Sequence, residues 1–270
     1  MTENQLPRHR YRLTLEYDGT NFSGWQKQSD ARTVQGDLHK AAIRIFGDIP
    51  MDIQGCGRTD AGVHALEYVA HLEVAACLPP QEVAKLLDAT LPKDMAILNV
   101  EDADHRFHAR HNCIARSYLY QLRSRKSAFG KRYSWWTHGE MDLAAMQRAA
   151  SMLTGMHDFL AFAEKQELKK STKVLVHQIR ILTDGDLVRV RVVASHFLWH
   201  MVRRLVGVLV EVGCGRLAES AVPALLHSPS DFPGNHTAPA AGLFFEKAFY
   251  EEGSLLRFLD NKSLTFARNE

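Results

Sequence analysis

Hydrophobic and polar residues alternate along residues 10–17, which is typical of a strand with one face buried. The apolar positions of this strand are Tyr11, Leu13, Leu15 and Tyr17. An irregular segment, residues 18–32, follows. Thr33 then precedes apolar residues spaced as on one face of a helix. These are Val34, Leu38, Ala41, Ala42 and Ile45. The pattern therefore predicts a strand, a loop and a helix capped by Thr33.

The same periods predict a series of further elements, which are strands through 68–74, 95–100, 116–122, 174–182 and 187–194 and helices through 83–87, 142–153 and 197–212. Asp184-Gly185 is typical of a hairpin turn between the last two strands. Both halves of the chain thus alternate strands and helices. We expect one α+β half over 1–108, a second over 109–250, and a charged tail over 251–270.

Composition fits a globular protein of 270 residues, with 46% hydrophobic and 24% charged residues. The net charge of +2 requires that an acidic partner be met by a local basic patch. The four cysteines are widely scattered, which indicates reduced thiols and a cytoplasmic location. The polar start and the lack of a long apolar stretch argue against secretion and membrane insertion.

The segment Gly57–His64, of sequence GRTDAGVH, sets an acid beside an arginine between two glycines. A carboxylate with a guanidinium beside it can stay ionised even where it is partly buried. Glycines suit a loop against which a large substrate must lie. The segment therefore indicates an active loop centred on Asp60, although Asp and Gly are also ordinary turn formers and a structural turn remains the alternative.

Metal and hydrolase sites receive less support from the sequence. His64 stands four residues after Asp60, but Gly62 between them argues against a helix that would bring both to one face. His105, His108 and His111 have no accompanying carboxylate or cysteine cluster at a metal-binding spacing. Ser195-His196 lacks the context of a nucleophile elbow.

Seven segments stand out in order along the chain: YDGTNFSGWQ at 17–26, TVQG at 33–36, GRTDAGVH at 57–64, FHAR at 107–110, RSYLY at 116–120, GMHDF at 155–159 and FLWHMVR at 197–203. Together they resemble the TruA family of tRNA pseudouridine synthases. The resemblance implies an α+β fold of two similar halves, which form one mainly antiparallel mixed sheet with a central cleft. This is the pseudouridine synthase fold.

The resemblance also implies a reaction: the bond between uracil and ribose breaks, the uracil rotates, and C5 replaces N1 on the ribose. Asp60 would be the nucleophile, with no metal or redox cofactor. Tyr118 would contact the target uridine, and Leu243 would lie beneath the uracil. Tyr118 and Tyr120, two residues apart on a strand, could equally be core aromatics.

Two arginines are further catalytic candidates. Arg58 could fill the position vacated by the flipped base or hold the flipped backbone, or it could simply anchor an ion pair. Arg203 is the candidate cation beside Asp60, although an arginine on a helix flank is usually solvated.

Candidate phosphate contacts are Lys27, Arg106, Arg110 and Arg116. Residues 123–136 add further basic side chains interleaved with aromatic ones. Where relatives commonly have an arginine before a late strand, this chain has Lys173, which cannot make the same bidentate phosphate contact.

The family further implies a homodimer that acts on tRNA, at uridines 38, 39 and 40 of the anticodon stem-loop. The alternative function is a catalytically silent tRNA-binding protein or RNA chaperone. An acid facing polyanionic RNA argues against this alternative, because binding alone would not need it.

Overall fold

The structure is a computed structural model that describes residues 8–164 and 171–261. Its contacts divide the chain into two compact units. Unit 1 contains residues up to Cys113 and the segment Phe244–Ala248, and unit 2 contains Ile114–Leu243 and the residues from Phe249 onward. The expected halves 1–108 and 109–250 stay a prediction about domains. Of the expected tail, Glu252–Asp260 forms a helix, and residues 262–270 lie outside the described residues.

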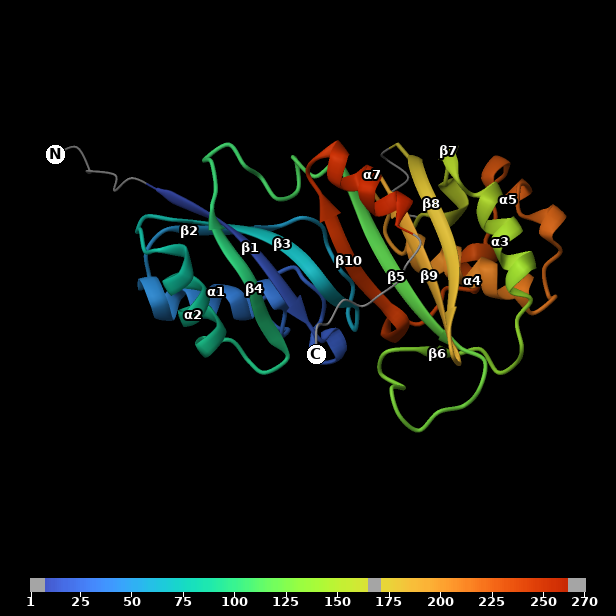
Figure 1. Ribbon diagram of the computed structural model, residues 1–270, viewed down its shortest axis with the longest axis horizontal. Helices are drawn as coiled ribbons and strands as arrows, with labels where there is room; N and C mark the ends of the chain where they lie inside the picture. The colour runs from blue at the N-terminus through green and yellow to red at the C-terminus, as the bar shows by residue number, and fades with distance from the viewer. Residues whose placement is uncertain (1–7, 165–170, 262–270) are drawn as a thin grey trace. The chain divides into compact units, whose positions relative to one another are not determined.

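Unit 1 is a sheet with two helices against it (Figure 1). Its strands are β1 (His9–Tyr17), β2 (Met51–Gly55), β3 (His64–Val74), β4 (Met95–Asp102) and most of β10 (Leu243–Phe249), and its helices are α1 (Val34–Phe46) and α2 (Pro80–Thr90). The strand order is β4-β1-β3-β10, with β2 also paired to β3. All these pairs are antiparallel except β10 with β3, which is parallel.

The first predicted strand and helix are confirmed. Along β1 every second residue from Tyr11 to Tyr17 is buried, so the alternation marks the face that packs into the core. Thr33 caps α1, because its hydroxyl accepts a hydrogen bond from the Gly36 N–H at 3.2 Å. Val34, Leu38, Ala41 and Ala42 are buried, as their helical spacing predicts.

Unit 2 also combines a sheet with helices. Its strands are β5 (Ala115–Arg123), β6 (Trp135–Trp136), β7 (Gly155–Asp158), β8 (Lys173–Asp184) and β9 (Leu187–Ala194), and its helices are α3 (Leu143–Met152), α4 (Met201–Gly213), α5 (Ala224–His227), α6 (Phe232–Asn235) and α7 (Glu252–Asp260). The antiparallel order is β5-β9-β8-β7, and β6 pairs with β5 in parallel.

Two helices pack against the strands of unit 2. Helix α3 contacts β8 and α4 (Figure 1). Leu255 of α7 joins Ala115, Val193 and Phe249 in a buried cluster. The α+β class and the mainly antiparallel pairing of strands are therefore confirmed. Within the described residues, no helix has the length and apolar character needed to cross a membrane.

One helix boundary differs from the sequence prediction. The apolar spacing from Phe197 onward predicts a helix over 197–212, but α4 begins only at Met201. His200, which precedes it, has a left-handed backbone with φ of 63° and so cannot continue a right-handed helix. Residues 197–200 therefore form an irregular entry to α4.

Candidate active site

Asp60 lies in the loop 56–63, which connects β2 to β3. The two strands pair from Met51 with Val74 to Gly55 with Ala70, and then separate. Beyond that point β10 takes the same edge of β3, with Phe244 opposite His64, because β1 already occupies the other edge. The Asp60 loop thus leaves the sheet where one neighbour of β3 gives way to another.

Thr59, directly before Asp60, holds the loop against the rest of unit 1. Its hydroxyl lies 2.9 Å from the hydroxyl of Tyr17, in a buried hydrogen bond. Its carbonyl accepts a hydrogen bond from the Trp25 N–H at 3.1 Å. Thr59 is buried, Asp60 is partly exposed, and Arg58 is exposed. The backbone is therefore fixed at Thr59 while the acid next to it can be approached from solvent.

Gly24 allows this close approach. A Cβ at Gly24 would lie 2.4 Å from the Thr59 carbonyl oxygen, far inside van der Waals contact, and the residue has φ of +91°. Both features exclude a side chain without strain. Gly24 of the 17–26 segment is therefore required by the loop that carries Asp60. The two sites are more than thirty residues apart in the sequence.

The chain after Asp60 turns back into β3. The Val63 N–H donates to the Asp60 carbonyl at 3.2 Å, and the Gly62 N–H donates to the Phe22 carbonyl at 3.2 Å. At the start of β3, Nδ1 of the buried His64 accepts a hydrogen bond from the Gly19 N–H at 3.0 Å. The 18–25 segment therefore contacts the loop on both sides of Asp60.

The 18–32 segment is itself braced by Arg32. The guanidinium donates to both carboxylate oxygens of Asp94, at 2.8 and 2.7 Å, and to Asp37 at 2.8 Å. These bonds raise the pKa of Arg32 above its ordinary value, so it stays charged. The same group lies 4.2 Å from the centre of the Phe22 ring. One arginine thus fixes the segment that supports the Asp60 loop.

Tyr68 of β3 closes the base of the loop. Its hydroxyl donates to the Gly57 carbonyl, and its ring lies 4.3 Å from that of Trp25, 5.7 Å from that of Tyr17 and 5.0 Å from that of Phe245. Aromatic packing of this kind is dense and tolerates little displacement. The Asp60 loop therefore rests on a rigid aromatic base.

Unit 1 contains five of the predicted site residues: Lys27, Arg58, Asp60, Arg106 and Arg110. Lys27, Arg106 and Arg110 are exposed, as phosphate contacts require, and the catalytic candidate Arg58 is exposed as well. The two later arginines lie in the segment 103–112 that follows β4. Their roles stay predictions.

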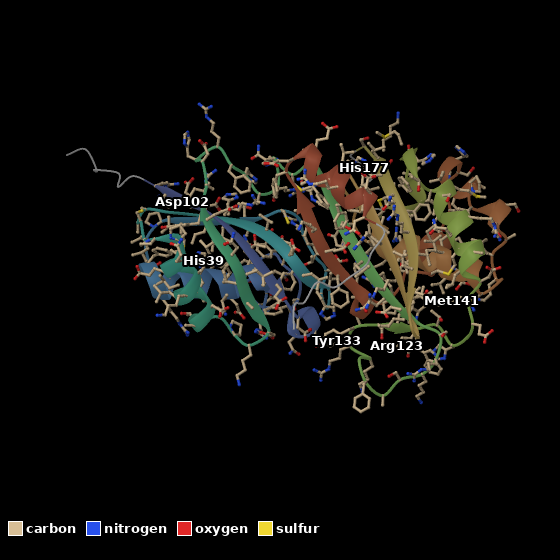
Figure 2. All side chains as sticks on the ribbon, in the orientation of Figure 1. His39, Asp102, Arg123, Tyr133, Met141 and His177 are labelled. Carbon is tan, nitrogen blue, oxygen red and sulfur yellow. The ribbon has the colours of Figure 1, made fainter. Side chains whose placement is uncertain are left out.

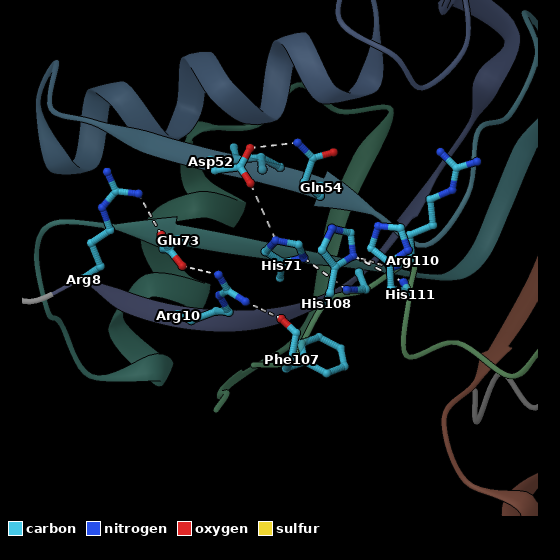
Figure 3. A network of polar contacts seen from close by, with 12 residues as sticks. Arg8, Arg10, Asp52, Gln54, His71, Glu73, Phe107, His108, Arg110 and His111 are labelled. Carbon is cyan, nitrogen blue, oxygen red and sulfur yellow. Dashed lines mark hydrogen bonds and ion pairs between the residues drawn. The ribbon is translucent and has the colours of Figure 1, made fainter. Parts of the chain in front are cut away.

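A histidine network holds that segment in place (Figure 3). Nδ1 of the buried His71, on β3, accepts a hydrogen bond from the Ala109 N–H at 3.1 Å. Nδ1 of His108 lies 3.1 Å from the Arg110 N and 3.3 Å from the His111 N. Burial, and then the nearby His108 and Arg10, lower the pKa of His71 to about 4. A neutral His71 is therefore the form that accepts the hydrogen bond and orients the backbone next to Arg110.

Unit 2 contains the other four predicted residues. Tyr118 lies on β5, is 7% exposed, and packs edge-on against Phe197 with ring centres 5.0 Å apart. Leu243 is buried at the start of β10. Arg116 is 9% exposed and donates to the Ser195 carbonyl at 3.1 Å, so little of it is open to an RNA phosphate. Its predicted RNA contact stays a prediction.

Arg203, on α4, holds the segment before Leu243. Its Nε donates to the Ala238 carbonyl at 2.7 Å, and the Ala238 N–H donates to the Arg203 carbonyl at 3.1 Å. Tyr120 donates to the Pro239 carbonyl at 2.7 Å. Arg203 and Tyr120 thus fix the backbone that leads to Leu243. Catalytic assistance by Arg203 stays a prediction.

Among the described residues, no group of three or more His, Cys, Asp or Glu side chains has the arrangement of a metal site. His64, the histidine closest in sequence to Asp60, is instead packed inside unit 1, with its ring stacked on Phe244 at 4.7 Å. All four cysteines are thiols.

Sequence reasoning missed the residues that position the loop. Tyr17, Trp25 and Tyr68 were recognised only as core or motif residues, although each contacts residues 57–59 through a hydrogen bond. The signal was present in the YDGTNFSGWQ segment, whose aromatic and glycine content exceeds what an ordinary loop needs. Nothing in the sequence, however, pairs Tyr17 with Thr59.

Known proteins resemble this chain over most of its length. A family model described as tRNA pseudouridine synthase matches residues 14–112 and 149–251. The protein named tRNA pseudouridine synthase A 2 from Bacillus anthracis is 38% identical over 241 residues, which cover 88% of this chain and 98% of the relative. The proteins named tRNA pseudouridine synthase A from Zymomonas mobilis and Methylococcus capsulatus are each 37% identical, over 90% of this chain and 100% and 90% of the relatives. An acid on a braced loop and this extent of similarity lead to one conclusion: the chain belongs to the tRNA pseudouridine synthase family, whose members are isomerases.

Proposed function

We propose that this protein isomerises uridine to pseudouridine in tRNA, with Asp60 as the nucleophile. The observation that carries the proposal is the support of the Asp60 loop. Thr59 is buried and doubly hydrogen-bonded, while Asp60 beside it is partly exposed. Holding a reactive group in a fixed position lowers the entropic cost of reaching the transition state. A loop that merely turned the chain would not need this support.

The proposed reaction adds and removes no atoms overall. The bond between N1 and C1′ breaks, the uracil rotates within the site, and a bond forms between C5 and C1′. The hydrogen on C5 leaves as a proton, and N1 gains one. Asp60 attacks as a carboxylate and is released at the end, as covalent catalysis by an acid requires. Tyr118 and Leu243 contact the base, and Arg58 and Arg203 assist.

The proposed substrate is the anticodon stem-loop, at uridines 38, 39 and 40. This site choice rests on the family resemblance. Extracting a base from a stacked stem costs a few kcal/mol, on the order of what a set of phosphate and stacking contacts can supply. Lys27, Arg106 and Arg110 are the exposed cations that we propose for phosphate contacts. A homodimer in the cytoplasm is proposed on the same resemblance, and light scattering of the purified protein tests the dimer.

Tritium release tests the reaction. Unmodified tRNA transcript labelled at C5 of uridine is incubated with the wild type and with Asp60→Asn, which keeps the size of the side chain but removes its charge. We expect release by the wild type and none by the variant, with tRNA binding and melting temperature retained in both. Binding to several tRNAs without release by the wild type would contradict the proposal and favour a silent RNA-binding protein. Primer-extension mapping of the product then tests positions 38–40.

A further inference from the structure

The loop between β5 and β6, residues 124–134, leaves the unit 2 sheet as a long excursion (Figure 1). Its four charged side chains are all basic: Arg125, Lys126, Lys131 and Arg132. All four are exposed. Such a concentration of positive charge on one loop favours a polyanion, although the net charge of the whole chain is only +2. The loop also lies outside the two stretches that the family model matches.

The base of this loop is fixed by hydrogen bonds. Arg123, labelled in Figure 2, is the last residue of β5. Its side chain donates to Asp186 at 2.6 Å and to the Ser134 hydroxyl at 3.2 Å. The Ser134 hydroxyl in turn donates to the Gly130 carbonyl at 3.1 Å. The Trp136 indole N–H donates to the Ser124 carbonyl at 3.3 Å. These contacts join the two ends of the loop to each other.

Phe129 is the most exposed large apolar residue of the described chain, at 86%. The hydroxyl of Ser127 accepts from the Phe129 N–H at 3.3 Å and donates to its carbonyl at 2.9 Å, so the backbone that presents the ring is in a defined turn. A phenyl ring in water between cations has no role in packing the fold. Stacking on a nucleic-acid base would bury one face of the ring.

We propose that Phe129 stacks on an unpaired base of the tRNA, while Lys126, Lys131 and Arg132 contact the adjacent phosphates. The loop is then an RNA-binding element of unit 2 that is separate in sequence from the Asp60 loop. A protein partner would need a wider apolar surface than Phe129 and the less exposed Tyr133 offer on this loop. The neighbours of Phe129 in the sequence are instead small or basic. This inference rests on the proposed function, because it takes tRNA as the ligand.

Three substitutions separate stacking from simple apolar contact. Phe129→Tyr keeps an aromatic ring, Phe129→Leu keeps an apolar side chain without one, and Phe129→Ala removes both. The residue is so exposed that all three should fold as the wild type does, which thermal melting checks. Leu256→Ala, which removes an apolar side chain that is 53% exposed on α7, is the matched control.

Affinity for unmodified tRNA is measured by filter binding with the full-length protein. We expect Phe129→Ala and Phe129→Leu to raise Kd about 5- to 150-fold, which is the range for losing one stacked base, and Phe129→Tyr and Leu256→Ala to leave it unchanged. Replacing Lys131 by Gln should lower the slope of log Kd against log salt by about 0.7 to 0.9, whereas the Phe129 variants should not change it.

Wild-type affinity in Phe129→Leu or Phe129→Ala would overturn the proposal. A shift of the variants toward monomer in sedimentation, with tRNA affinity unchanged, would also overturn it and assign the ring to self-association. Tritium release by the wild type is scored separately. The affinities of the Phe129 variants test the stacking proposal, whereas tritium release by the wild type tests the proposed reaction. Failure of one is therefore distinguishable from failure of the other.

Discussion

Substituting Gly24 by alanine should displace the active loop. The new Cβ would lie 2.4 Å from the Thr59 carbonyl oxygen, whereas ordinary contact begins at 3.4 Å, so the oxygen must move by about 1 Å. Thr59 is bonded directly to Asp60, and the Trp25 N–H that holds this oxygen at 3.1 Å would lose its geometry. The displacement therefore passes to Asp60.

A second glycine, Gly47, serves to separate the effect of the Gly24 contact on the reaction rate from the cost of backbone strain. Gly24 and Gly47 have φ of +91° and +83°, but a Cβ at Gly47 would meet nothing within 4 Å. Each alanine should cost about 1–3 kcal/mol of stability for its backbone conformation. Only Gly24→Ala also moves the loop, and a misplacement of ~1 Å at a reacting group costs on the order of 100-fold in rate.

The assay is tritium release at saturating tRNA, combined with urea unfolding of both variants. We expect Gly47→Ala to keep the wild-type kcat and Gly24→Ala to lose it by about 100-fold, although both lose stability. If Gly24→Ala retains wild-type kcat, or if both variants lose it equally, the contact between Gly24 and Thr59 does not position Asp60.

Three further predictions concern the bonds and packing of unit 1. In a double-mutant cycle by urea unfolding, Tyr17→Phe and Thr59→Val should show a coupling of about 0.5–1.5 kcal/mol, and no coupling would mean that their hydrogen bond does not stabilise the fold. Because the pKa of His71 is lowered to about 4, the folded state resists protonating it. The contribution of His71 to the free energy of unfolding should be fully present above pH 6.5 and should fall as the pH drops toward 4. At pH 5 the expected loss is about 2 kcal/mol. His71→Asn, whose side-chain oxygen can accept the same hydrogen bond, should lose this part of the pH dependence, and an unchanged slope would refute it. Leu38→Ala, at a fully buried position, should cost about 2–5 kcal/mol in urea unfolding, and a loss below 1 kcal/mol would mean that the core refills the space.

Sequence periodicity predicted the elements whose signal is local. The alternation in β1 and the Thr33 cap of α1 depend only on residues within a few positions of each other, so both were predicted correctly. Strand β10 was not predicted. Its burial shows no alternation over Leu243–Phe249, and its partner β3 lies far earlier in the chain. Parallel pairing over such a distance leaves no local pattern.

The candidate site shows the same limit. Asp60 stood out because an acid, an arginine and two glycines occur together in eight residues. The residues that support its loop could not be identified in this way, since Tyr17 and Thr59 meet only after β1 and β3 have paired. Arg203 beside the acid stays a prediction, and its hydrogen bond to the Ala238 carbonyl, between residues far apart in the sequence, had no local signal. A role that depends on tertiary neighbours cannot be predicted from spacing alone.

The pairing of β10 with β3 has a consequence for biosynthesis. The ribosome makes β3 and the Asp60 loop early, but β10, the strand that completes their edge, is made only after residues 114–242. Until then the first residues of β3 present unsatisfied backbone groups on that side, a situation that slows folding and exposes nascent chains to aggregation. A truncated chain that ends at Cys113 should therefore lack a finished site, because the edge of β3 beside the Asp60 loop is completed only after β10 has been made.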